Sequence, residues 1–167
     1  EFYSEVLGRN WDKEALIVDT RFNGGGWLHD DLATMLNGKK YVDFYPRGVH
    51  YGHEPQNKWI KPSVVLMSES NYSDAHGFPY AYKALEIGDC VGMPVPGTMT
   101  AVWWETLQDE TLYFGIPQVG TKDPEGNYLE NKQLEPDYTV RQEYNEVVKG
   151  RDQQLETAVE VLMGKME

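Results

Sequence analysis

The sequence almost lacks cysteine, and this absence excludes two common ways of stabilising a small domain. Among 167 residues there is one cysteine, Cys90. One thiol cannot form a disulfide within the chain, and it cannot build a zinc site from several cysteines. His50 and His53 have no carboxylate or cysteine at a ligand-like spacing, so we interpret them as solvated loop histidines. The sequence therefore predicts no metal ion and no other cofactor.

Basic residues and long apolar runs are also scarce. The chain has 15 lysine and arginine residues against 27 aspartate and glutamate residues, and its formal net charge is −12. Binding to nucleic acid needs a basic surface, so we exclude a nucleic-acid partner. The apolar runs are all short, which predicts no membrane-spanning helix. Phosphate-binding motifs are missing too, because neither Gly-Lys-Ser/Thr nor G-x-G-x-x-G occurs.

The sequence does contain enough apolar material for one core. Its hydrophobic fraction is 40%, with 11 tyrosines and 5 tryptophans, which is typical of a folded globular protein. The length predicts a single domain spanning residues 1–167. The first residues, EFYSEVLGRNW, form no signal peptide and begin as if within a helix that ends near Leu7. We therefore expect a piece of a longer polypeptide.

The most informative stretch is residues 63–87, SVVLMSESNYSDAHGFPYAYKALEI. Residues 63–67 are apolar and partly β-branched, which predicts a buried strand. After a polar turn, helical spacing predicts a helix that begins at Ser73. A serine at such a turn lies beside free backbone N–H groups, where acyl-transfer enzymes place a nucleophile, although simple capping of the helix explains it equally well. The apolar face of this helix would consist of Ala75, Phe78, Tyr82 and Leu85.

A second strand, turn and helix pattern occurs earlier in the chain. Residues 15–20 form a nearly continuous apolar run, typical of a strand buried on both faces. They lead into Gly24-Gly25-Gly26, where three glycines allow a backbone to approach a ligand closely. This layout suits an anion, but a plain structural turn is the stronger interpretation of the glycines alone. The helix predicted after them spans residues 30–36, with Leu28, Leu32 and Leu36 on one face.

The remaining segments continue the alternation of strands and helices. Residues 37–62 show no clear period and are interpreted as an extended loop or short edge strands, whose aromatic side chains either shape a substrate groove or shield the core. The alternation predicts an α/β layered domain with a mostly parallel sheet and some antiparallel pairs. Short strands are predicted over residues 89–92, 101–105, 111–116 and 138–140, and a closing helix over 152–166 with Asp152 as its N-cap and a stripe of Leu155, Val159, Leu162 and Met166.

Four blocks of the sequence together resemble the catalytic C-terminal domain of peptidase family S41. They are LIVDTRFNGGG, SESNYSDAHGFPYAYKALEIG, LENKQLEPDYTV and GRDQQLETAVEVL, and they follow the family's order within residues 15–163. The tricorn-protease-like branch fits best, ahead of the carboxyl-terminal processing proteases. The resemblance implies a ClpP/crotonase-like fold, a β-β-α superhelix with a twisted sheet. It also implies a serine endopeptidase that acts on peptides or proteins, with an upstream catalytic subdomain and often a PDZ-like domain in the same polypeptide.

The resemblance assigns roles to individual positions. Ser73 matches the nucleophile of the family, and the amide of Asp74 with an amide of Gly25 or Gly26 matches its oxyanion hole. Glu130 matches the acidic residue that orients the base through a bridging serine in the tricorn branch, although an ordinary solvated loop carboxylate is the alternative. These assignments require the hydroxyl of Ser73 and the amides of the glycine turn to face one pocket, because both must reach the same carbonyl oxygen.

The sequence departs from the family at the general base. The processing proteases use a lysine about 25 residues after the nucleophile, and Thr98 occupies the matching position. Lys83 lies too far along the predicted helix, and His76 is expected to point away from the hydroxyl. The tricorn branch takes a histidine from the upstream subdomain, so we expect the base to lie outside this chain. A serine without a base is a poor nucleophile, which predicts that the 167 residues fold but show little or no peptidase activity.

Two other functional classes share this fold. One is a non-catalytic binding module like the retinoid-binding proteins of the eye, and the other is a crotonase-like enzyme that stabilises thioester enolates without needing Ser73. The Ser73-Asp74 pair, the glycine triplet and Glu130 favour the peptidase. The family implies a periplasmic or exported location in a bacterium, whereas tricorn itself implies the cytoplasm. The aromatic content suggests exposed apolar surface that would support a homo-oligomer.

Overall fold

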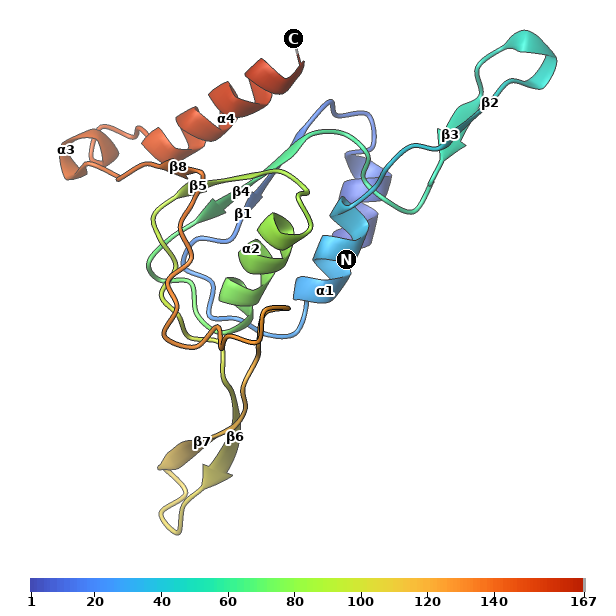
Figure 1. The fold of residues 1–167 in the computed structure, drawn as a ribbon. Helices are drawn as coiled ribbons and strands as arrows, with labels where there is room; N and C mark the ends of the chain where they lie inside the picture. Colours follow the sequence, from blue (N-terminus) through green and yellow to red (C-terminus); the bar gives the residue numbers. More distant parts are fainter. Residues whose placement is uncertain (167) are drawn as a thin grey trace.

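A four-stranded sheet forms the centre of the protein, whose computed structural model describes residues 1–166 (Figure 1). All its strand pairs are parallel, in the order β1-β4-β5-β8. The predicted α/β architecture with a mostly parallel sheet is therefore confirmed. The four strands are β1 (Leu16–Asp19), β4 (Ser63–Met67), β5 (Asp89–Gly92) and β8 (Tyr138–Thr139).

Strand β4 is the central support of this sheet. Every one of its five residues is buried, because β1 and β5 pair with it on either side and helices cover both of its faces. Its side chains alternate between two cores: Val65 and Met67 point to one, and Val64 and Leu66 to the other. Such a strand needs apolar residues at successive positions, which explains its continuous hydrophobic run.

Helices α1 (His29–Leu36) and α2 (Asp74–Ala84) lie together on one face of the sheet, and α4 (Gln153–Met166) lies on the other (Figure 1). The first core contains Met35 of α1 together with Phe78 and Tyr82 of α2. The second contains Ala158 and Leu162 of α4. The two strand-to-helix units therefore place the beginnings of α1 and α2 at the same edge of the sheet.

The predicted apolar stripe of α4 is wrong in its rotation. Leu162 is buried, but Leu155, Val159 and Met166 are between 39% and 45% exposed. The buried face runs instead through Gln154, Ala158 and Leu162. Ala158 and Leu162 pack in one core with Val64 and Leu66 of β4, and the buried Gln154 donates from its amide nitrogen to the carbonyl of Val140 at 2.8 Å.

The other two predicted stripes are correct except at their ends. Leu85 follows the last residue of α2 and is 48% exposed, and Leu28 precedes α1 and is 59% exposed. The remaining members pack against the core, with Leu32 partly buried. The prediction from helical periodicity therefore failed at the two positions that lie just outside the helices.

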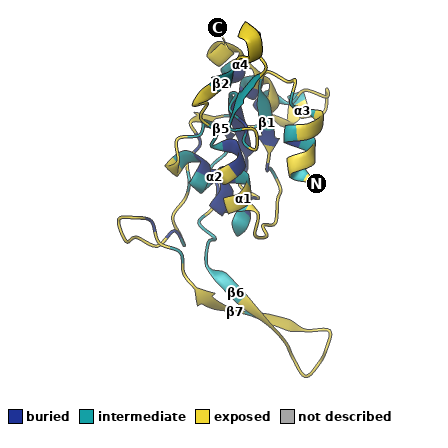
Figure 2. Cartoon of the chain, turned by 90° about the vertical axis from the view of Figure 1, so that its right-hand side faces the viewer, coloured by how far each residue is buried: buried dark blue, intermediate teal, exposed yellow. Residues whose placement is uncertain are grey.

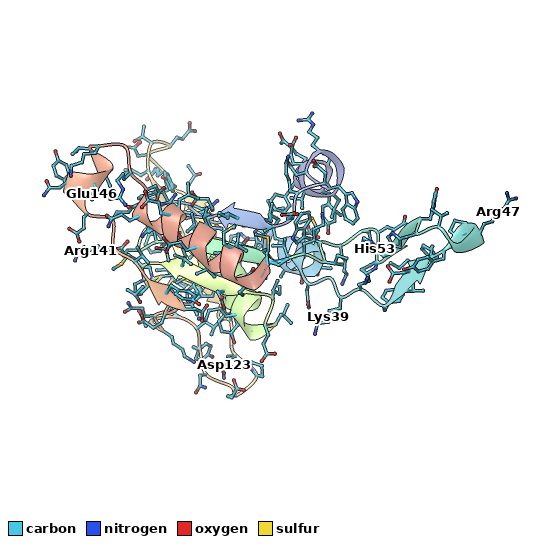
Figure 3. The ribbon with its side chains drawn as sticks, turned by 90° about the horizontal axis from the view of Figure 1, so that it is seen from above. Lys39, Arg47, His53, Asp123, Arg141 and Glu146 are labelled. Carbon is cyan, nitrogen blue, oxygen red and sulfur yellow. The ribbon has the colours of Figure 1, made fainter. Side chains whose placement is uncertain are left out.

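Two antiparallel hairpins extend from this body in different directions (Figure 1). The first joins β2 (Val42–Phe44) and β3 (Gly52–Glu54) and carries Arg47 at its far end (Figure 3). The second joins β6 (Ala101–Thr106) and β7 (Tyr113–Val119). Of the two interpretations of residues 37–62, short strands are correct. The short helical segments are η1 (Ser4–Arg9), η2 (Pro46–Gly48) and α3 (Tyr144–Val147).

Helices of the described part, residues 1–166, are all too short or too polar to cross a membrane. Over the same residues there is no group of three histidine, cysteine, aspartate or glutamate side chains arranged to hold a metal ion. The single thiol, Cys90, is buried within β5, and this burial raises its pKa to about 12. It is therefore a core residue rather than a reactive thiol.

Candidate active site

Two turns meet where the neighbouring strands β1 and β4 end. The turn after β1 contains Gly24-Gly25-Gly26, and the turn after β4 contains Ser73. A backbone hydrogen bond from the N–H of Tyr72 to the carbonyl of Asn23, at 3.0 Å, joins them directly. Because parallel strands end at the same edge of a sheet, residues about 50 positions apart in the chain become neighbours here.

Gly25 is the point of closest approach between the two turns. A Cβ atom at this position would lie 2.7 Å from the carbonyl oxygen of Tyr72 and 2.8 Å from the amide nitrogen of Asp74. Its φ angle of 97° is also unfavourable for any residue with a side chain. Glycine is therefore required here by contact and by conformation together.

Ser73 is held in an unusual conformation at the beginning of α2. Its φ and ψ angles are 56° and −121°, a combination that costs a non-glycine residue about 1–3 kcal/mol. Its hydroxyl makes no capping hydrogen bond to the helix, so the capping alternative is wrong. The half-buried side chain instead lines a cavity of about 300 Å³, together with Gly26 and Asp74.

The backbone N–H groups at this cavity differ in whether they are free to bind an oxygen. The N–H of Gly25 donates to Oδ1 of Asn23 at 2.7 Å and is therefore engaged. Within residues 1–166, no hydrogen bond engages the N–H of Gly26. The N–H of Asp74 is the first of α2, where helices leave their donors without an internal partner. Gly26 and Asp74, which both line the cavity, thus each have a backbone N–H that no hydrogen bond within residues 1–166 engages.

The carboxylate of Asp74 fixes the distance between the two turns. It accepts hydrogen bonds from the N–H groups of Leu28 and His29, at 2.8 Å and 3.1 Å, and it also pairs with Nδ1 of His29. The first turn of α1 is therefore capped by a residue of α2. A negative charge at this helix beginning is further stabilised by the helix dipole.

Each turn has its own anchor in the body of the protein. The serine turn is anchored by the buried side chain of Asn71, which accepts from the N–H of Ser68 at 3.2 Å and donates to Thr20 Oγ1 and the Ala75 carbonyl, each at 3.0 Å. All of these partners are uncharged. The serine turn is consequently held by neutral hydrogen bonds.

The glycine turn is anchored instead by Arg21, which lies directly after β1. Its guanidinium contacts the carboxylates of Asp19 and Asp152, at 2.7 Å and 2.8 Å, and so joins this turn to the beginning of α4. The hydrogen bond from Arg21 lowers the pKa of Asp152 to about 2. Asp152 also accepts from the N–H of Leu155 at 3.0 Å, which confirms its predicted role as N-cap.

Glu130 lies behind one wall of the cavity and does not line it. Its Oε2 atom accepts hydrogen bonds from the N–H groups of Met99 and Thr100, at 2.8 Å and 2.7 Å, and Met99 is part of the cavity wall. Burial raises the pKa of Glu130, but hydrogen bonds from Thr100 and Met99 outweigh it, so the pKa lies below its usual value. The carboxylate is therefore no ordinary solvated one: in this chain it holds a wall segment.

None of the candidate bases within the chain named by the sequence lies at this cavity. Lys83 pairs with Asp137 at 2.6 Å. His76 is buried, and this burial lowers its pKa. Thr98, at the position of the family's lysine, has a buried hydroxyl without a hydrogen-bond partner among residues 1–166. The aromatic segment over residues 41–59 also contributes nothing to the cavity.

Sequence reasoning did not find several residues that shape the site. Asn23 engages Gly25, His29 pairs with Asp74, and Trp104 lines the cavity from the second hairpin. An asparagine directly before a glycine run is a signal for a side chain that bonds the turn. His29 and Trp104 carry no such local signal, because their position depends on the folding of distant segments.

Comparison with known proteins agrees with this geometry. The profile described as peptidase family S41 matches residues 1–140. The chain is 29% identical to the tricorn protease of Thermoplasma volcanium over 171 residues, covering 100% of this chain and 16% of that protein. It is 27% identical to a tricorn protease homolog of Saccharolobus solfataricus over 167 residues, covering 99% of this chain and 16% of that one.

A solved structure supports the fold independently. The crystal structure of the tricorn protease superposes with a TM-score of 0.80 at 23% identity, covering 91% of this chain and 15% of that one. The chain belongs to peptidase family S41 and carries a tricorn-like protease domain of that family. It spans about one sixth of the length of the curated relatives described above.

Proposed function

We propose that residues 1–167 form a single domain that supplies the nucleophile and the oxyanion hole of a serine peptidase, while the general base comes from an upstream subdomain of the same polypeptide. The observation that carries this proposal is the convergence at one cavity of the uncapped hydroxyl of Ser73 and the amides of Gly26 and Asp74. Peptidase family membership supports the reaction class.

In the proposed reaction the upstream base accepts the proton of the Ser73 hydroxyl, and Oγ attacks the carbonyl carbon of a peptide bond. The N–H groups of Gly26 and Asp74 donate to the oxygen that becomes negative. Collapse of this intermediate breaks the C–N bond and releases the amine, which takes up the proton. Water then attacks the acyl group on Ser73 and releases the acid. Each amide contributes about 3 kcal/mol to stabilising the transition state.

We further propose that Glu130 acts on two groups at once. One carboxylate oxygen holds the N–H groups of Met99 and Thr100, and the other is available to orient the incoming base, as the family resemblance implies. A carboxylate has enough lone pairs for both tasks. His29 also lines the cavity, but it is paired with Asp74, so without the upstream subdomain we expect the hydroxyl to lack a free proton acceptor and the chain to be inactive.

The resemblance to tricorn proteases also bears on the cellular location, the substrates, the additional domains and the assembly of the protein. Of the two expected locations, similarity to tricorn proteases supports the cytoplasm over the periplasm. The same resemblance supports peptides or proteins as substrates and leaves a place for a PDZ-like domain and for assembly of several copies. The retinoid-binding and crotonase alternatives gain no support, since neither explains a strained serine at the oxyanion amides.

The proposal is tested by comparing this chain with the full-length protein. The 167 residues alone should give little or no cleavage of a mixed peptide library, whereas the full-length protein should cleave it and react with a fluorophosphonate at Ser73. Ser73→Ala should abolish both. Robust cleavage by the isolated chain that depends on Ser73 would show that the base lies within it. Cleavage by the full-length protein that survives Ser73→Ala would refute the nucleophile itself.

A further inference from the structure

The hairpin of β6 and β7 has two different faces. Its register pairs Trp104 with Gly115 and Trp103 with Ile116, and successive side chains of a strand point to opposite faces. Val102 and Trp104 therefore share one face, while Trp103 lies on the other. Figure 2 shows that this hairpin reaches away from the body and is largely exposed.

Of the two tryptophans, only Trp104 lies on the face that continues into the cavity that contains Ser73. Val102 and Trp104 both line that cavity, whereas Trp103 does not. The hairpin thus extends the wall of the cavity outward as a surface formed by Val102, Trp104 and Tyr113, which we call the aromatic shelf. Both tryptophans are similarly exposed, at 59% for Trp104 and 61% for Trp103, so position rather than burial distinguishes them.

The indole of Trp104 is held in place before any ligand arrives. It lies over Gly115, where an added Cβ atom would come within 3.0 Å of the ring. Tyr113 packs against it edge-on, with ring centroids 5.4 Å apart. A preorganised ring loses little freedom when a ligand packs on it. Glycine at position 115 is therefore explained by the space that the indole occupies.

The charges around the cavity favour an uncharged ligand group. Among the described residues that line it, the ionisable side chains are His29 and Asp74, and they pair with each other. Within residues 1–166, no lysine or arginine lines the cavity. Glu105, Asp109 and Glu110 add negative charge farther along the hairpin. An acidic side chain would find no partner here and would be repelled.

We propose that the aromatic shelf binds a bulky apolar or aromatic side chain of the peptide, close to the bond that Ser73 attacks. This inference rests on the proposed peptidase function and adds the substrate class. An apolar or aromatic side chain is the proposed occupant because the shelf is continuous with the cavity that contains Ser73 and carries no cation for an acidic residue. Trp104 is the residue that sets the preference, since it joins the cavity wall to the shelf.

Binding tests this proposal without requiring cleavage. The full-length protein carrying Ser73→Ala is titrated with fluorescent hexapeptides that are identical except for a central Phe, Leu, Ala or Glu, and Kd is read by anisotropy. We expect the Phe peptide to bind about tenfold more tightly than the Ala peptide, and the Glu peptide most weakly. Trp104→Ala should remove this preference, and Trp104→Phe should retain most of it. Trp103→Ala on the opposite face is the matched control and should leave it unchanged.

The outcomes separate this inference from the proposed function. Loss of the preference in Trp104→Ala but not in Trp103→Ala supports the shelf. Equal binding of all four peptides, or equal effects of both tryptophan variants, overturns it. Fluorophosphonate reaction at Ser73 is measured in parallel on the unsubstituted protein. A preference for the Phe peptide without fluorophosphonate reaction supports the aromatic shelf and refutes the peptidase function. Fluorophosphonate reaction without such a preference supports the peptidase function and refutes the shelf.

Discussion

The turns after β1 and β4 meet the same demand in different ways. Both must turn sharply at the end of a buried strand, and both contain a residue with a positive φ angle that lies at the contact between them. The first turn uses Gly25, for which this conformation is easy. The second uses Ser73, for which it is costly.

This difference agrees with the proposal that the second turn carries the reacting group. A glycine would relieve the strain at position 73, but it would also remove the hydroxyl that reaches the cavity. At position 25 no side chain is wanted, because the backbone itself must come close to Tyr72 and Asp74. At positions 73 and 25, strain is present where the side chain lines the cavity and absent where only the backbone is in contact.

The largest expected effect comes from adding a Cβ atom at Gly25, where the two turns approach each other most closely. Gly25→Ala places a Cβ atom 2.7 Å from the carbonyl oxygen of Tyr72, so the turns must move apart and the oxyanion amides lose their alignment. We expect fluorophosphonate labelling of the full-length protein to fall by about 100-fold. Gly24→Ala is the matched control, because a Cβ atom there meets nothing within 4 Å. Similar losses in both variants would contradict the close-contact explanation.

The next effect concerns the carboxylate that connects the turns. Asp74→Asn keeps the backbone amide but removes the charge that accepts from Leu28 and His29. We expect the free energy of unfolding to fall by about 1–3 kcal/mol, and labelling of Ser73 to slow by about tenfold as the turns loosen. Urea unfolding and labelling rates measure the two effects. Asp30→Asn, which changes an exposed carboxylate in the first turn of α1, should change either value little.

A smaller effect tests the strain at position 73 directly. Ser73→Gly relieves the unfavourable φ angle of 56°, and the gain should exceed the loss of chain entropy that glycine brings. We expect the free energy of unfolding to rise by about 1 kcal/mol relative to Ser73→Ala, which keeps the strain. Thermal and urea unfolding provide the measurement. Equal stability of the two variants would mean that the turn is not strained.

The smallest effect distinguishes Asn71, the anchor of the serine turn, from the Arg21–Asp152 pair, the anchor of the glycine turn. The two differ in how their contribution to the free energy of unfolding depends on pH. Asp152 has a folded pKa of about 2, below its ordinary value of 3.8, so its contribution to stability is fully present above about pH 4 and is lost as the pH falls toward 2. The stability difference between wild type and Asp152→Asn should shrink over this range. The corresponding difference for Asn71→Ala should stay constant, because the partners of Asn71 are neutral. Urea unfolding between pH 5 and pH 2 compares them.

The sequence predicted the framework better than the details of the site. Continuous apolar runs identified β1 and β4, since strands covered on both faces need apolar residues throughout. The serine and glycine turns were recognisable because turn chemistry is local. Which of Gly25 and Gly26 has an engaged N–H was not recognisable, because it depends on the hydrogen bond that the Gly25 N–H donates to the Asn23 side chain.

Other features depend on contacts between distant segments and could not be predicted. Gln154 is buried in place of Leu155 and its amide is satisfied by the carbonyl of Val140, a partner 14 residues away. Trp104 lines the cavity because of where its hairpin leaves the body, and spacing along β6 alone cannot distinguish it from Trp103. Periodicity describes an element in isolation, whereas these positions are decided by its neighbours.

The contact between Arg21 and Asp152 has a consequence for how the domain is delimited. The family match ends at residue 140. Beyond that point, Asp152 at the beginning of α4 pairs with Arg21 behind the glycine turn, and α4 covers the second core. A protein shortened to the matched region would keep every proposed reactive group. It would nevertheless expose Val64 and Leu66 to water and remove the Asp152 carboxylate that pairs with Arg21 behind the glycine turn, so residues 141–166 support the candidate site without lining its cavity.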